Sequence, residues 1–263
     1  MQTASAHVRE QNGRPQRASY ANGAGPGQRF EISRLSGPLG AVITGLDLSS
    51  PLSENDFDRI HAAHLDHHLL IFRDQRITPQ QHIDFSRRFG KLMIHVLHQF
   101  HLPGHPEILT VSNVIENGKP IGLGDAGKYW HSDISYKELP SLGSLLHAQE
   151  LPEIGGDTVF ANMHLAWNML PVHLRKVVAG RKALFVSEGF TTRIEGLAED
   201  ESRQVLDEIF AHSIRPEHVY RHHWQPHDLV FWDNRSLIHL AAGCPPHLRR
   251  TLYRTTVEGD KPF

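Results

Sequence analysis

Three side chains in two short segments of the sequence suit one metal ion. His131 and Asp133 lie in a Trp-His-Ser-Asp segment, and His239 lies shortly after a Trp-Asp-Asn-Arg segment. Two histidines and one carboxylate form a facial triad, which most often serves iron(II) because its open face lets oxygen and a co-substrate bind side by side. If both segments are strands, residues 131 and 133 share a face, since side chains alternate along a strand. The sequence therefore predicts an iron site and an oxygenase.

The metal prediction needs further support, because a His-x-Asp tripeptide arises easily in a chain with 21 histidines among 263 residues. Thr158 ends a Gly-Gly-Asp-Thr segment, and Arg250 and Arg254 follow His239. Arginine suits a carboxylate because its planar guanidinium makes two parallel, charge-assisted hydrogen bonds and stays protonated. The two arginines are four positions apart on an expected strand, so they share a face and lie roughly 13 Å apart. This spacing allows two separate anions to be bound.

Four segments together carry a resemblance to a known family. They are Trp-His-Ser-Asp at 130–133, Gly-Gly-Asp-Thr at 155–158, Trp-Asp-Asn-Arg at 232–235 with His239, and Arg-Arg-Thr-Leu-Tyr-Arg-Thr-Thr-Val at 249–257. From about residue 30 to residue 263, the chain resembles the iron(II)- and 2-oxoglutarate-dependent dioxygenases of the taurine dioxygenase and phenoxyacetate-herbicide dioxygenase family.

The resemblance implies a role for each of these residues. The iron(II) ligands, which form the catalytic centre, would be His131, Asp133 and His239. Thr158 and Arg250 would bind the distal carboxylate of 2-oxoglutarate, the co-substrate. Arg254 matches the position that binds the anionic head of the substrate in taurine-type enzymes, and His95 matches a histidine of the substrate pocket. The expected reaction uses O2, hydroxylates the substrate and decarboxylates 2-oxoglutarate to succinate.

The expected substrate is a small organic anion. Arg254 favours taurine or another sulfonate, a sulfate ester or a carboxylate, because an unpaired buried guanidinium would be costly. Two positions depart from the taurine enzymes, since Gly127 stands where they carry an asparagine and His98 where they carry an aromatic hydroxyl donor. Taurine is therefore one candidate among several anions.

A segment that family members carry is missing from this sequence. Gly180 is followed directly by Arg181, where the resemblance implies several dozen residues that include a substrate lid. Lids exclude water and complete an active site, so this loss predicts poor coupling or altered specificity. Two alternatives stay open: a non-catalytic or degraded relative that still binds iron and 2-oxoglutarate, and a zinc hydrolase with a metal-activated water. The zinc alternative gives no role to Arg250.

Composition and charge exclude other classes of partner. The formal net charge is −2 and the pI about 6.9, without a long Lys/Arg run, so nothing indicates binding to nucleic acid or to a membrane. Cys244 is the only cysteine, which excludes an intrachain disulfide and favours a cytoplasmic location. Residues 1–29 have few large apolar groups and are predicted to be a disordered tail before one domain, residues 30–263. A homodimer is the default oligomer.

The elements that would position these residues are mainly strands with flanking helices. Helices are predicted after a capping residue, Ser53, with Phe57, Ile60 and Leu65 on its apolar stripe, after the capping box of Thr78, and at about 163–178 and 199–211. The predicted strands are 30–35, 41–47, 69–73, 107–113, 142–149, 183–187, 219–224, 229–233 and 249–257. Together they predict a double-stranded β-helix, a cupin-like jelly roll with the metal in the barrel mouth. Its core is expected to include Trp130, Trp224 and Trp232.

Overall fold

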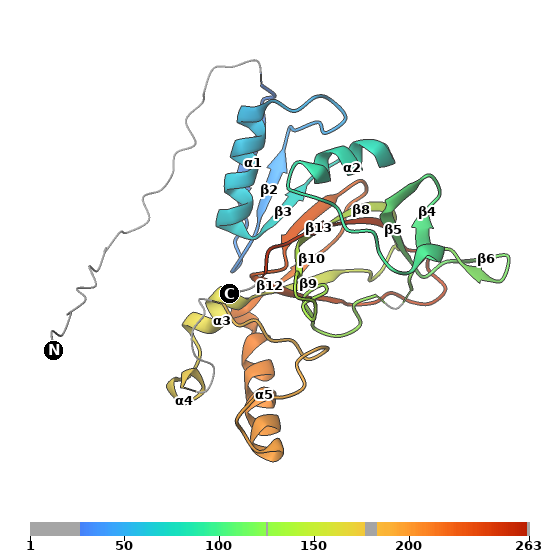
Figure 1. The fold of residues 1–263 in the computed structure, drawn as a ribbon. Helices are drawn as coiled ribbons and strands as arrows, with labels where there is room; N and C mark the ends of the chain where they lie inside the picture. The colour runs from blue at the N-terminus through green and yellow to red at the C-terminus, as the bar shows by residue number, and fades with distance from the viewer. Residues whose placement is uncertain (1–26, 125, 177–182, 262–263) are drawn as a thin grey trace, which may run out of the picture.

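The computed structural model describes residues 27–124, 126–176 and 183–261, which form two facing sheets with helices around them (Figure 1). In chain order, the strands of the larger sheet are β1 (Glu31–Arg34), β2 (Ala41–Thr44), β3 (Leu69–Phe72), β4 (His101–Leu102), β5 (His105–Ser112), β8 (Ser141–Glu150), β11 (Leu229–Asp233) and β13 (Thr251–Glu258). The smaller sheet consists of β9 (Thr158–Asn162), β10 (Val219–His222) and β12 (Leu237–Ala241). A separate hairpin joins β6 (Ile115–Glu116) to β7 (Lys119–Pro120).

The strand order is that of a jelly roll. The larger sheet runs β1-β2-β3-β11-β8-β13-β5-β4 and the smaller runs β10-β9-β12. Strands that are neighbours in space are mostly far apart in sequence, as β11 is from β3 and β13 from β5. Antiparallel pairing predominates, and β2 with β3 is a parallel pair. The molecule is therefore mainly β with flanking helices, a double-stranded β-helix as the sequence predicts.

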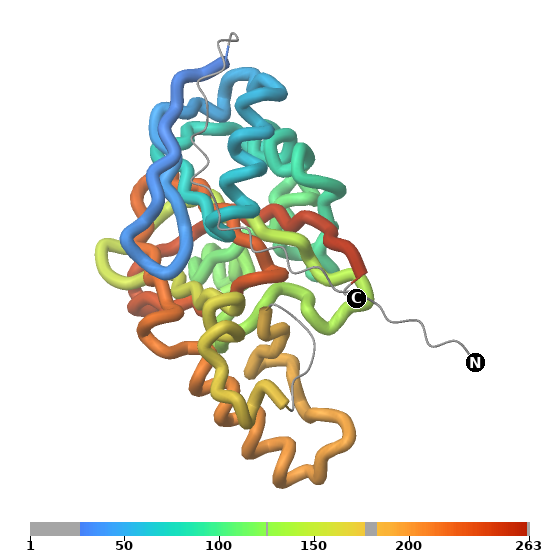
Figure 2. The backbone as a smooth tube through the Cα atoms, turned by 90° about the vertical axis from the view of Figure 1, so that its left-hand side faces the viewer, coloured from blue at the N-terminus to red at the C-terminus, as the bar shows by residue number. Residues whose placement is uncertain are grey.

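Helices lie at both ends of the molecule. They are α1 (Glu54–His67), α2 (Pro79–Arg87), α3 (Met163–Asn168), α4 (Val172–Arg175) and α5 (Glu199–Ser213). The predicted caps are present: Ser53 accepts a hydrogen bond from the backbone N–H of Asp56, and Thr78 forms the capping box of α2. Figure 2 shows the N-terminal strands and α1 at one end and α5 at the other. No helix in the described ranges is long and apolar enough to cross a membrane.

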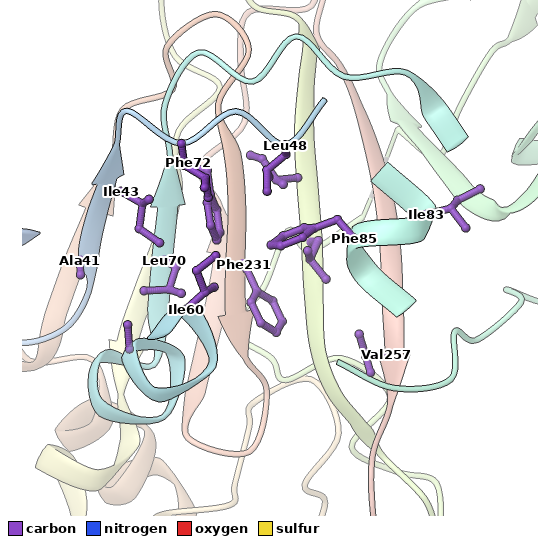
Figure 3. Packing of buried hydrophobic residues seen from close by; sticks show 14 of the residues in the cluster. Ala41, Ile43, Leu48, Ile60, Leu70, Phe72, Ile83, Phe85, Phe231 and Val257 are labelled. Atoms are coloured by element: carbon purple, nitrogen blue, oxygen red, sulfur yellow. The ribbon is translucent and has the colours of Figure 1, made fainter. Parts of the chain in front are cut away.

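The larger sheet is buried on both faces, which explains the almost wholly apolar sequences of β3 and β11. Along β11, Leu229 and Phe231 point to a cluster formed with α1 and α2, whereas Val230 and Trp232 point to a cluster shared with the smaller sheet. Figure 3 shows the first cluster, in which Ile60, Phe85 and Phe231 come from α1, α2 and β11. Leu65 is 49% exposed and does not belong to this stripe, contrary to the prediction. The second cluster fills the space between the sheets.

Two predicted elements differ from the structure. The helix expected over 163–178 breaks into α3 and α4, because Pro171 lies between them and a proline cannot donate the helical hydrogen bond. Its last two residues lie outside the described part of the chain. The strand expected over 183–187 is irregular, and its Leu184 is buried in a cluster with α3 and α5. The apolar run in this segment therefore indicated that the segment is buried, but it did not indicate that the segment pairs as a strand.

Candidate active site

The three predicted metal ligands meet between the two sheets. One ligand atom from each of His131, Asp133 and His239 lies within 4.8 Å of the others, and all three residues are buried. His239 lies on β12 of the smaller sheet, and Asp133 contacts Ser144 on β8 and Arg254 on β13 of the larger sheet. Residues more than 100 positions apart therefore form one site.

The segment that carries His131 and Asp133 is not the strand that the sequence predicts. Only His131 pairs with β12, in an isolated bridge in which its backbone N–H and that of His239 each donate to the other's carbonyl oxygen, at 3.1 and 2.8 Å. The chain then turns, with Ile134 at φ 56°. The two side chains thus reach the same ion through a turn and not through the alternation of a strand, which corrects the sequence-based reasoning.

His239 and Asp133 are in the protonation states that a metal needs. Nδ1 of His131 donates to the carbonyl oxygen of Tyr129 at 2.9 Å, which leaves Nε2 for a metal. Burial, with the nearby His131, lowers the pKa of His239 to about 3, so its imidazole is neutral at neutral pH. Burial acts to raise the pKa of Asp133, but Arg254 and a hydrogen bond with His131 hold it well below its usual value. Two imidazoles and one carboxylate are a donor set that fits iron(II).

One ring nitrogen of His239 lacks a hydrogen-bond partner among the described residues. This atom, Nδ1, is buried. The imidazole lies 4.2 Å from the ring of His131 and 4.8 Å from that of Trp232, measured between centroids. A buried polar atom without a partner is costly. The donor set and this atom together indicate a site built to bind a cation.

Thr158 and Arg250 line the same cavity as the two metal-binding histidines. Thr158 begins β9, a strand absent from the sequence-based list, and its Oγ1 accepts a hydrogen bond from Nε1 of Trp224 at 3.1 Å. Nε of Arg250 donates to the carbonyl oxygen of Gly156 at 3.0 Å. Trp224 was expected to belong to the barrel core, but it also orients the hydroxyl group that faces this cavity.

Arg250 is a half-buried residue whose side chain lines this cavity. Burial lowers its pKa to about 10, which still leaves it charged at neutral pH. Asp157 contributes a favourable charge, but its carboxylate is bound by Arg221 at 2.7 Å. Within the described ranges, no carboxylate forms an ion pair with Arg250. A guanidinium of this kind favours an anionic ligand.

Arg254 lines the same cavity as Arg250 and Thr158 and contacts Asp133. Nη1 of Arg254 donates to Oδ1 of Asp133 at 3.2 Å, and its Nε is buried without a partner in the described part of the chain. Burial, followed by the charge of Arg254, lowers the pKa of His95, and Asp133 acts to raise it. Arg254 therefore contacts a predicted metal ligand directly, whereas His95 is close enough to both residues for their charges to act on its pKa.

A group of aromatic side chains lies beside His131. Phe190 lies 6.0 Å from Tyr129, 5.1 Å from Tyr136 and 6.2 Å from His131 between ring centroids. Tyr129 is 44% and Tyr136 66% exposed, so the group faces solvent. Sequence reasoning missed these residues, since Phe190 follows an irregular segment. The position of Tyr129 and Tyr136 on either side of the His-x-Asp pair was the available signal.

Asn234 was expected only to shape a turn near the metal, and the sequence did not predict its contacts. It lies between β11 and β12, is 1% exposed and forms hydrogen bonds to the turn that carries Asp133. Its place in the Trp-Asp-Asn-Arg segment was a signal for a role near the site. Ser144, which donates to Oδ2 of Asp133 at 2.7 Å, had no such signal.

Comparisons with known proteins agree with this geometry. The family model "Taurine catabolism dioxygenase TauD, TfdA family" matches residues 31–180 and 172–256. Pentalenolactone F synthase of Streptomyces arenae is 29% identical over 89% of this chain and 97% of its own length. The (S)-phenoxypropionate/alpha-ketoglutarate-dioxygenase of Sphingobium herbicidovorans is 28% identical over 88% and 96%. The crystal structure of a taurine dioxygenase from Burkholderia xenovorans superposes with a TM-score of 0.77 and 30% identity, over 88% of this chain and 90% of that one.

The matches also bear on the missing segment. The alignment with the Streptomyces enzyme extends over 290 positions, more than the 263 residues of this chain, so the relative carries residues without a counterpart here. The expected deletion point, between Gly180 and Arg181, lies outside the described residues.

The identity of these relatives decides between the functional alternatives. The relatives from Sphingobium and Burkholderia are named as dioxygenases, and the family model spans both halves of the metal site. This favours an enzyme over a degraded relative and gives no support to a zinc hydrolase. The metal triad fits iron(II), and 2-oxoglutarate is the co-substrate of this class. The chain belongs to the TauD, TfdA family and is an iron(II)- and 2-oxoglutarate-dependent dioxygenase.

Proposed function

We propose that this enzyme hydroxylates a small organic anion that has an apolar, preferably aromatic, body. Arg254 and His95 bind its anionic head, and the aromatic group of Tyr129, Tyr136 and Phe190 contacts its body. Thr158 and Arg250 bind the distal carboxylate of 2-oxoglutarate. The iron ligands are His131, Asp133 and His239.

This proposal rests on the incomplete hydrogen bonding of the Arg254 side chain. Its side chain is 10% exposed, contacts a metal ligand and has a buried Nε without a partner among the described residues. The guanidinium has five N–H donors, and the carboxylate of Asp133 accepts from only one of its nitrogen atoms. The hydrogen bonds of Arg254 are therefore incomplete. An anionic head group would complete its hydrogen bonds and place the adjoining carbon atoms beside the metal.

The division of labour follows from the positions of the two arginines. Iron(II), held by the triad, would activate dioxygen, whose reduction is balanced by the oxidation of 2-oxoglutarate to succinate and carbon dioxide and by the hydroxylation of the substrate. The protein supplies orientation: Arg250 holds the co-substrate at its far end, and Arg254 holds the substrate at its charged end. Because the arginines bind different anions, the two molecules do not compete for one cation.

The substrate class is narrowed by three positions. Gly127 offers no side chain for a small polar substrate such as taurine, and His98 replaces an aromatic hydroxyl donor. Phe190 and its neighbours offer flat apolar surface, which suits an aromatic or alkyl body. The relative from Sphingobium herbicidovorans acts on (S)-phenoxypropionate. We therefore place an aryloxy or other aromatic carboxylate first, ahead of sulfate esters and sulfonates, with taurine last.

The test measures 2-oxoglutarate consumption under oxygen with paired substrates. An aryloxyalkanoate, an alkyl sulfate, an alkanesulfonate and taurine are each compared with a neutral amide or alcohol of similar shape. We expect the anions to stimulate consumption and their neutral partners to have no effect. Arg254→Gln should remove the stimulation, and Arg254→Lys should retain part of it because it keeps the charge. Equal stimulation by neutral compounds would overturn the assignment of the anionic head.

A separate measurement tests the cofactor residues. Anaerobic addition of iron(II) and 2-oxoglutarate should produce the weak visible absorption band of the chelate. The band should be lost in His131→Ala, and in Arg250→Ala it should require much more 2-oxoglutarate. If the wild-type protein gives no band, the cofactor assignments fail, whatever the substrate panel shows.

The domain division and the location stay proposals. We propose that residues 30–263 form the catalytic domain and that the preceding residues are a tail. Of that tail, Gln28 already contacts the domain, since its backbone N–H donates to Asp56 at 3.0 Å. The single cysteine favours a reducing cytoplasm.

A further inference from the structure

The turn that carries Asp133 depends on neighbouring side chains for its shape. Residues 132–134 belong to no strand, and Ile134 has φ 56°. Positive φ is unfavourable for a β-branched residue and persists only where the surroundings enforce it. The serines of β8 and the turn after β11 provide this support. Ser141 donates to the backbone carbonyl oxygen of Asp133 at 3.1 Å, and Ser132 donates to that of Asn234 at 2.5 Å.

The side-chain amide of Asn234 is fully hydrogen-bonded. Its Oδ1 accepts from Nε1 of Trp232 at 2.9 Å and from the backbone N–H of Asp133 at 3.3 Å. Its Nδ2 donates to the hydroxyl groups of Ser141, at 2.7 Å, and of Ser144, at 3.2 Å. The two N–H donors near Oδ1 fix the orientation of the amide, because a flipped amide would place NH2 against them. Nδ2 must therefore face the serines.

This orientation determines where the proton of Ser144 points. Oγ of Ser144 accepts from Asn234, so its single O–H is available to donate to Oδ2 of Asp133, which lies 2.7 Å away. The other carboxylate oxygen, Oδ1, faces Nη1 of Arg254 at 3.2 Å and Nε2 of His131 at 3.6 Å. Oδ2 therefore accepts from Ser144, whereas Oδ1 accepts from Arg254 and lies on the side of the His131 ring, where a metal held by both residues would bind.

We propose that Asn234 and Ser144 are positioning residues that restrict Asp133 to binding the metal through Oδ1 alone. The inference rests on the proposed role of Asp133 as an iron ligand. A carboxylate bound through both oxygens would fill a coordination position that the co-substrate or dioxygen needs. By occupying Oδ2, the Asn234–Ser144 pair keeps that position open.

Three variants separate this role from general support of the fold. Ser144→Ala removes the hydroxyl group that binds Oδ2. Asn234→Asp keeps the shape of the side chain but has no N–H, so Ser144 is drawn to donate to the introduced carboxylate and not to Asp133. Ser141→Ala is the matched control, because it removes an equally buried hydroxyl bound by the same amide, but one that contacts the backbone of Asp133 and not its carboxylate.

The readouts are metal binding and spectroscopy of the full-length protein, without turnover. Anaerobic titration of iron(II) into apoprotein should show about 10- to 100-fold weaker binding in Ser144→Ala and Asn234→Asp, the range for partners that orient a ligand. Ser141→Ala should lower the unfolding temperature and weaken iron(II) binding less than either variant, because it loosens the turn but leaves Oδ2 of Asp133 bound to Ser144. With cobalt(II), the visible spectrum should change shape in the first two variants, because the carboxylate is free to bind through both oxygens.

A double-mutant cycle tests whether Asn234 acts through Ser144. Asn234→Asp should weaken metal binding in the wild-type background and have little further effect in Ser144→Ala. Additive losses, an unchanged cobalt(II) spectrum, or equal weakening by Ser141→Ala would each overturn the inference. Absence of metal binding in the wild-type protein would instead overturn the proposed iron site, so the two failures are distinguishable.

Discussion

Arg250 and Arg249 are adjacent in the sequence but differ in environment. Arg249 is exposed and paired with Glu150 and Glu116, whereas Arg250 is half-buried and lines the cavity of the metal ligands. We expect Arg250→Lys to weaken 2-oxoglutarate binding about 10- to 100-fold, since it loses a bidentate charge-assisted hydrogen bond of about 1.5–3 kcal/mol. Arg249→Lys is the control and should bind as wild type. Anaerobic titration with 2-oxoglutarate checks both, and equal affinities of the two variants would contradict the assignment.

Gly127 combines a positive φ with close contact to a metal ligand. Its φ is +77°, and a Cβ atom there would lie 3.0 Å from Cε1 of His131. Gly127→Ala should destabilise the fold by about 1–2 kcal/mol and weaken iron(II) binding about tenfold, because the methyl group displaces the imidazole. Gly104→Ala is a matched control, since φ is +80° and no atom lies within 4 Å of the added Cβ. It should lose similar stability in urea and keep its metal affinity.

Strand β13 contributes to both the core and the metal site, because its successive side chains point to opposite faces of the sheet. Thr255 points toward α2, where its hydroxyl lies 2.7 Å from that of Ser86, and Arg254 points toward Asp133. Helix α2 thus supports the strand from the face opposite the metal. Its stability should influence the fold without changing the ligands directly.

Substitutions in the capping box of α2 test whether the stability of this helix affects the fold without affecting the metal ligands. Thr78→Ala removes the acceptor for the N–H of Gln81 and should lower the free energy of unfolding by about 1 kcal/mol. Thr78→Ser keeps the hydroxyl group and should restore most of the loss. Iron(II) affinity should be unchanged in both variants. A large loss of affinity in Thr78→Ala would show that α2 influences the site more strongly than the alternation along β13 implies.

At the scale of the whole molecule, buried histidines make stability depend on pH. Burial lowers the pKa of His64 in α1 and of His82 in α2 to about 3, compared with about 6.5 in an unfolded chain. Below pH 6.5 the unfolded state therefore binds more protons than the folded state, so stability falls as the pH decreases. From pH 7.5 to 5.5, each histidine should contribute a loss of about 1.4 kcal/mol.

Two substitutions in α1 test this dependence. His64→Phe replaces an imidazole that stacks on Phe231 at 3.8 Å and should reduce the loss between pH 7.5 and 5.5 by about 1.4 kcal/mol. His61→Phe changes an exposed residue of the same helix and should leave the loss unchanged. Urea unfolding of apoprotein at both pH values provides the measurement. An identical pH dependence in wild type and His64→Phe would show that His64 is protonated in the folded state.

Local signals predicted many of the elements. The caps at Ser53 and Thr78 and the strand over 229–233 were correct, because a cap and a doubly buried strand are encoded by neighbouring residues. Strand β9 was missed, since its five residues follow a glycine pair that reads as a turn. The segment 183–187 was assigned wrongly, because an apolar run does not show whether a pairing edge is available.

For this protein, the sequence by itself determined the chemistry of the site. It identified the residues that form the metal triad, the two arginines and the family, because ligand type and spacing are properties of short segments. Only the tertiary structure decided how Asp133 is held. Its contacts with Ser144, Asn234 and Arg254 join one turn to two strands and to a second turn, all far apart in the chain. Such contacts depend on strand pairing and register across the whole barrel, and no local pattern encodes them.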